Sequence, residues 1–139
     1  MLEIYIDGAS KGYPGPSGIS FIIKKSKVRI EGQKYIGESS NHVAEFQALL
    51  FVLDYCQQEF SSEILSIRSD SKLLVDLIDK GKYKKEPFAT LVEQAIAKMA
   101  HFPYCFIKWI PESQNKHADR LAKQAIQLKG ESIRKYPSA

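Results

Sequence analysis

A helix that is apolar on nearly every side lies in the first half of the chain and limits the folds open to it. Ser39, Ser40 and Asn41 are good N-cap residues for a helix that runs to about Gln58. The middle of this segment, residues 48–53, has the sequence ALLFVL. A helix without a polar face is expected where other elements cover it. We therefore predict a core helix that is sandwiched by other parts of the fold.

Strand and helix signals alternate along the rest of the chain. Apolar and polar residues alternate over residues 2–7, as in a strand, and a loop rich in Gly and Pro follows up to Gly18. Two more strands are expected over residues 19–25 and 27–36, and their short connections predict an antiparallel meander. After the core helix, the pattern predicts a strand over residues 64–69, helices over 71–80 and 87–100, a strand over 104–110 and a helix through Leu128.

This order of elements, β-β-β-α-β-α-α-β-α, predicts an α/β fold. The sheet is expected to be mixed and five-stranded, with helices on both of its faces. One domain over residues 1–129 accounts for all of these elements, and residues 130–139 are expected to form a frayed C-terminal tail.

Composition narrows the classes of protein further. Hydrophobic residues make up 44% and charged residues 26%, which is typical of a soluble globular chain. No run of about 18 apolar residues exists, so no membrane span is expected, and the absence of a leader pattern favours a cytoplasmic location. Cys56 and Cys105 lie in apolar contexts and are expected to be packed free thiols.

The net charge of +4 and the pI near 9.0 would by themselves indicate an ordinary soluble surface. The positive charge becomes more informative beside four acids that lie in distinctive local contexts. These are Asp7 in DGAS, Glu45 in NHVAE, Asp70 in SDS and Asp119 in NKHAD. A basic exterior around an acidic centre suits a polyanion that is held over cations.

The expected elements bring these acids toward one another. Asp7 and Asp70 each follow a strand, and ligands of open α/β sheets bind at the carboxyl ends of strands. Glu45 lies in the first turns of the core helix, four residues after Asn41 and on the same face, while Asp119 is near the start of the last helix. Taken singly, each acid is more simply a solvated or capping carboxylate.

Four converging carboxylates would either raise their own pKa values or capture metal ions. Two like charges about 4 Å apart repel by about 4 kcal/mol at an effective dielectric of 20. Oxygen ligands without a nearby Cys favour Mg²⁺ or Mn²⁺. Two such ions about 3.5 to 4 Å apart are the arrangement that catalyses in-line phosphodiester displacement.

In their order and contexts the four acids resemble the ribonuclease H family, over Leu2 to about Leu128. The resemblance is to the compact type 1 ribonuclease HI, which lacks a basic protrusion. It implies an endoribonuclease that cleaves the RNA strand of RNA–DNA hybrids and leaves 3′-hydroxyl and 5′-phosphate ends. Nothing in the sequence requires a protein partner or more than a monomer. Two ions are implied with substrate bound: Asp7 bridges both, Glu45 and Asp70 hold one, and Asp119 holds the other. The implied contacts to the hybrid's minor groove come from Gly8, Ala9, Ser10, Gly12, Asn41, His42 and Ser71.

The chain departs from the better-known bacterial pattern at several positions. Tyr13 precedes Pro14-Gly15 where many relatives have Asn, and Trp109 stands where many have a loop His. Trp109 is expected in the core, and His117 at the surface. The basic cluster at residues 80–85 is equally consistent with contacting DNA phosphates and with solubilising a turn.

Two other functions stay open on these grounds. One is a nucleic-acid-binding protein that keeps the fold with weak or no turnover. The other is a different nuclease or a transposase built on the same fold.

Overall fold

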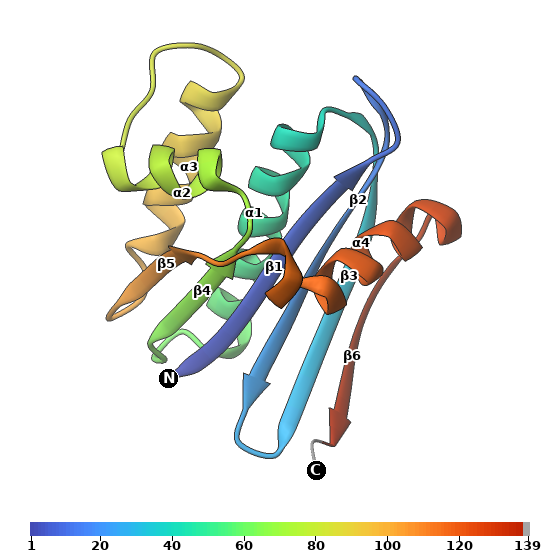
Figure 1. Ribbon diagram of the computed structural model, residues 1–139. Helices are drawn as coiled ribbons and strands as arrows, with labels where there is room; N and C mark the ends of the chain where they lie inside the picture. Colours follow the sequence, from blue (N-terminus) through green and yellow to red (C-terminus); the bar gives the residue numbers. More distant parts are fainter. Residues whose placement is uncertain (138–139) are drawn as a thin grey trace.

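One mixed sheet forms the centre of the molecule (Figure 1). The computed structural model describes residues 1–137, and in this range six strands are hydrogen-bonded in the order β5-β4-β1-β2-β3-β6. The β1–β2 and β2–β3 pairs are antiparallel, whereas β1–β4 and β4–β5 are parallel, so the predicted meander is confirmed. The strands are β1 (Leu2–Ser10), β2 (Gly15–Lys25), β3 (Val28–Ser39), β4 (Leu65–Ser69), β5 (Cys105–Trp109) and β6 (Glu131–Pro137).

Helices cover both faces of the sheet, as predicted (Figure 1). They are α1 (Asn41–Glu59), α2 (Lys72–Lys80), α3 (Phe88–Met99) and α4 (Lys116–Leu128), with a 3₁₀ turn, η1 (Glu112–Gln114), before α4. The helices α1, α2 and α3 lie on one face, and α4 lies on the other.

The helix α1 is the core helix that the sequence predicts. It packs against β1, β2 and α3, and Leu49, Val52 and Leu53 have no exposed surface. The Ser40 hydroxyl accepts a hydrogen bond from the Val43 amide, which caps the helix where predicted.

The expectation of five strands was one too few. Residues 131–137 were expected in the tail, but they form β6, which pairs antiparallel with β3 from Val28↔Pro137 to Lys34↔Glu131. Most β6 side chains are exposed, because the strand is held by backbone pairing to the free edge of β3, and such a strand has no apolar alternation for the sequence to reveal. Residues 138–139 of the expected tail lie outside the described residues.

None of the helices in residues 1–137 combines the length and the apolar character that a membrane crossing requires.

Candidate active site

Two of the four acids come from neighbouring parallel strands. The pairing of β1 with β4 ends at Ile6↔Ser69, and Asp7 and Asp70 are the next residues on each chain segment. Although β1 itself continues to Ser10 along β2, Asp7 is therefore at the carboxyl end of the parallel pair. The two carboxylates therefore come from adjacent positions at the carboxyl ends of β1 and β4 as paired strands.

Glu45 lies near the same end of β1 because α1 packs closely against this strand at Gly8. A Cβ atom built on Gly8 would lie 2.5 Å from the Glu45 amide nitrogen and 2.6 Å from the Ala44 carbonyl oxygen, so only glycine fits there. This close approach places the second turn of α1, which carries the buried Glu45, against the strand that carries Asp7.

The acids gather in one cleft. One carboxylate oxygen from each of Asp7, Glu45 and Asp70 lies within 4.8 Å of the others. Asp119, in the first turn of α4, shares a hydrogen bond with Asp7 and pairs with Lys123 at 2.9 Å. All four line a cleft of about 490 Å³.

Burial and mutual repulsion raise the proton affinity of this cluster. Burial, aided by the charge of Asp70 and by the hydrogen bond with Asp119, raises the pKa of Asp7 to about 9. Burial and the charge of Asp70 raise the pKa of Glu45 to about 7, against a hydrogen bond from Ser71. The pKa of Asp70 is also raised, by burial first and by Glu112 and Asp119 next. A divalent cation would relieve this repulsion, so the donor set fits one.

Comparisons with known proteins agree with this geometry. The model of the family described as "Reverse transcriptase-like" matches residues 5–125. The protein EbsB of Enterococcus faecalis is 38% identical over 128 residues, which are 91% of this chain and 95% of EbsB. The crystal structure of ribonuclease H1 from Halobacterium salinarum superposes with a TM-score of 0.80 and 26% identity, covering 91% of this chain and 97% of that one.

LC11-RNase H1, solved in complex with an RNA/DNA hybrid, gives a TM-score of 0.79 with 33% identity and covers 92% of this chain and 98% of that one. This chain is a member of the ribonuclease H family. It spans 36% of the length of the mycobacterial relatives that it matches.

Most of the nucleic-acid contacts expected from the ribonuclease H resemblance line the acidic cleft. They are Gly8, Ala9, Ser10, Asn41, His42 and Ser71. Gly12 does not line it, but it follows on the β1–β2 turn, where its carbonyl accepts a hydrogen bond from the Ser10 hydroxyl. The His42 Nδ1 atom lies 3.4 Å from the Glu45 carboxylate, so it borders the acids directly.

Asn115 contacts the acidic cluster, although the sequence assigned it no role. Its side chain is only 2% exposed, and its Nδ2 donates to the Ile6 carbonyl at 2.8 Å and to the Asp70 carboxylate at 3.2 Å. Its own carbonyl accepts from the Asp119 amide at 3.1 Å. Asn115 thus connects the strand of Asp7 with Asp70 and with the helix of Asp119. A polar residue four positions before Asp119 was the available signal.

We expect Asn115→Ala to disorder the acidic site. The substitution removes one buried and one partly buried hydrogen bond, so the free energy of unfolding should fall by about 1–3 kcal/mol. Affinity for Mn²⁺, measured by calorimetry, should fall by about 10- to 100-fold, as for other groups that orient ligands. Asn115→Asp keeps the shape of the side chain but places an oxygen against the Ile6 carbonyl, so it should also lower the affinity for Mn²⁺. Full Mn²⁺ affinity in either variant would show that the amide does not position the acids.

Two expectations about aromatic and histidine residues meet different outcomes. The prediction of a core position for Trp109 is wrong, because the residue is 49% exposed and its Nε1 donates to the Asp70 carbonyl at 3.1 Å. The reason is that β5 is an edge strand, so its end borders solvent. His117 is partly exposed and lies 3.1 Å from the Glu31 carboxylate. It does not line the acidic cleft.

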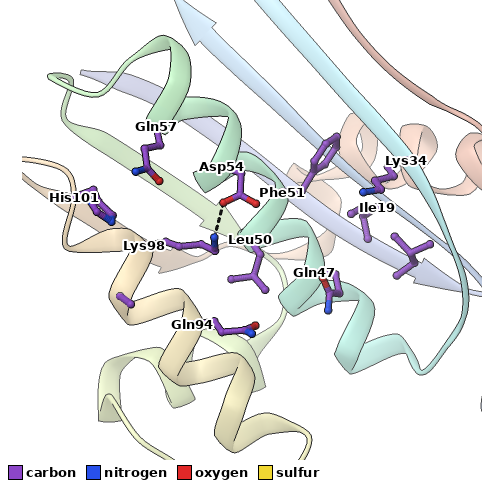
Figure 2. A pocket seen from close by; sticks show the side chains of 12 residues that line it. Ile19, Lys34, Gln47, Leu50, Phe51, Asp54, Gln57, Gln94, Lys98 and His101 are labelled. Atoms are coloured by element: carbon purple, nitrogen blue, oxygen red, sulfur yellow. Dashed lines mark hydrogen bonds and ion pairs between the residues drawn. The ribbon is translucent and has the colours of Figure 1, made fainter.

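A second hollow, of about 570 Å³, lies beside α1 and α3 (Figure 2). Asp54 is the one acid among the residues that line it, and it pairs with Lys98 at 2.6 Å. Its other polar side chains include Gln47, Gln57 and Gln94. An acid that is paired with a lysine and surrounded by amides does not form a ligand set for divalent cations, so the acidic cleft is the better candidate for a metal site.

Proposed function

We propose that this protein is a metal-dependent endoribonuclease that hydrolyses the RNA strand of RNA–DNA hybrids and leaves 3′-hydroxyl and 5′-phosphate ends. The observation that carries this proposal is the set of three carboxylate oxygens within 4.8 Å, contributed by Asp7, Glu45 and Asp70 of a ribonuclease H family member. A hybrid substrate is supported by the 33% identical LC11-RNase H1, which was solved with an RNA/DNA hybrid.

Two Mg²⁺ or Mn²⁺ ions are the proposed cofactors when substrate is bound. Asp7, Glu45 and Asp70 would hold one ion, and Asp7 with Asp119 would hold the other. Bound there, divalent ions supply a nucleophilic water and stabilise the leaving oxygen. Support comes from the all-oxygen donor set and from the pKa values of Asp7 and Glu45, which burial raises first and the charge of Asp70 next, so that a divalent cation would favour the charged carboxylates.

The remaining residues of the cleft bind and orient the substrate in this proposal. The backbone of Gly8 to Gly12, with Asn41, His42 and Ser71, lies along the minor groove, where contacts to 2′-hydroxyl groups distinguish RNA from DNA. The exposed lysines between Lys80 and Lys85 are suited to DNA phosphates. The protein is proposed to act as a cytoplasmic monomer without an obligatory protein partner.

Cleavage of labelled duplexes tests the proposal. The purified protein is incubated with an RNA–DNA hybrid, double-stranded RNA or double-stranded DNA, in Mg²⁺, in Mn²⁺, or in EDTA. We expect cutting of the RNA strand of the hybrid alone, and its complete loss in EDTA. Tight hybrid binding without cleavage in either metal would instead identify a binding protein that has lost turnover, and cutting of DNA would identify another nuclease of this fold.

A further inference from the structure

The outer faces of β4 and β5 are left open by the helices. On that side of the sheet α4 packs across β1, β2 and β3, so β4 and β5 lie beyond it (Figure 1). Alternate residues of a strand share a face, which places Phe106 and Lys108 on the open side. In the parallel register, Ser66 and Arg68 of β4 stand opposite Phe106 and Lys108.

Two aromatic rings stand in the solvent on this face. Tyr104 is 62% exposed and Phe106 is 55% exposed. Their rings are parallel within 2°, with centroids 6.0 Å apart. Neither ring is buried by the fold, so their shared orientation leaves flat apolar surfaces available for stacking. Trp109, an odd-numbered position of β5, falls on the other face of the strand, where its Nε1 donates to the Asp70 carbonyl at 3.1 Å.

The open face carries more cations than acids. The register joins Phe106, Ser66, Glu3 and Lys24 in one row across β5, β4, β1 and β2, and Lys108, Arg68 and Tyr5 in the next. These rows carry three cations, Lys24, Arg68 and Lys108, and one acid, Glu3. Glu3 pairs with both Lys24 and Arg68. Lys108 is exposed beside the rings. The face is therefore aromatic and positively charged at once.

We propose that this face binds single-stranded nucleic acid, with bases stacked on Tyr104 and Phe106 and phosphates beside Lys108 and Arg68. Sequence-tolerant strand binding combines these two features, namely a stacking platform and a positive track. A protein partner fits less well, because the cores of protein interfaces are depleted in charged residues, whereas Lys108 shares the face of the two rings on β5 and Arg68 stands opposite it on β4. This binding surface goes beyond the proposed cleavage and does not require it.

Fluorescence anisotropy with labelled 12-nucleotide RNA and DNA of one sequence tests the proposal, in EDTA so that no strand is cut. The double variant Tyr104→Ala/Phe106→Ala should bind either strand at least about tenfold more weakly than the native protein. The control Val28→Ala/Ile133→Ala removes exposed apolar side chains from the opposite edge of the sheet and should bind normally. A preference for RNA or DNA in the native protein identifies which strand the face accepts.

A charge variant keeps the test decisive if the double variant does not fold. Lys108→Glu on β5 should weaken strand binding about tenfold, while Lys135→Glu, on the other edge strand, should have little effect. Cleavage of a short blunt hybrid in Mg²⁺ should be unchanged in all four variants, which separates this surface from the active site. Unchanged strand binding in both the double variant and Lys108→Glu would overturn the proposal. So would a native protein that self-associates in light scattering through these aromatics, since the face would then join two copies of the chain.

Discussion

Asp7→Asn is expected to abolish hybrid cleavage while making the metal-free protein more stable. Turnover should fall by a factor of at least about 10³, because the carboxylate shared by both proposed metal positions is gone. The free energy of unfolding at pH 7 in EDTA should rise by about 2–4 kcal/mol, since the folded native protein must keep a proton on Asp7 that the unfolded chain releases at this pH, and the neutral amide removes that cost. Labelled-hybrid assays and urea unfolding measure the two effects.

The stability gain should depend on pH. The pKa of Asp7 is raised from 3.8 to about 9 in the folded protein, so between these values the folded state holds a proton that the unfolded state releases. Stability of the metal-free native protein should therefore fall as the pH rises from about 4 to about 9, and Asp7→Asn should flatten that slope.

Metal should reverse the order of stabilities. At about 1,000 times its dissociation constant a divalent ion stabilises the native protein by about 4.1 kcal/mol, and the variant should gain far less. Asp54→Asn is the matched control, because Asp54 lies in the other hollow and pairs with Lys98. It should retain cleavage and show no change in the pH slope. Marked destabilisation of the metal-free Asp7→Asn protein would contradict a repulsive acidic cluster.

Gly8→Ala is the second substitution with a large expected effect. The new Cβ would meet backbone atoms of Ala44 and Glu45, which cannot rotate away, so β1 and α1 must separate. Overpacking of this kind costs about 1–3 kcal/mol or more in stability. It also moves the Glu45 backbone away from Asp7, and a displacement of about 1 Å can cost about 100-fold in turnover.

Gly130→Ala provides the control for Gly8→Ala. A Cβ at Gly130 has its nearest neighbour at 3.9 Å, so this variant should match the native protein in thermal unfolding and in cleavage. A Gly8→Ala protein with native Mn²⁺ affinity and turnover would show that the close approach of α1 to β1 does not position the site.

Local patterns in the sequence were sufficient to predict most elements and to select the four acids of the proposed site. The apolar run at residues 48–53 predicts a buried helix whatever surrounds it, and α1 is that helix. The short polar contexts of Asp7, Glu45, Asp70 and Asp119 identify the acids, because each context is carried by neighbours in the chain.

Only the tertiary structure decided the features that depend on distant partners. The strand β6 exists because β3 offers an unpaired edge, and backbone hydrogen bonds leave no trace in side-chain type. Trp109 is exposed because β5 ends the sheet, which depends on strand order and not on its apolar neighbours. Asn115 joins Ile6 and Asp70, which precede it in the chain by 109 and 45 positions, and this role appears only once the three residues meet. Local sequence thus determined which groups are present, and long-range packing determined which of them touch.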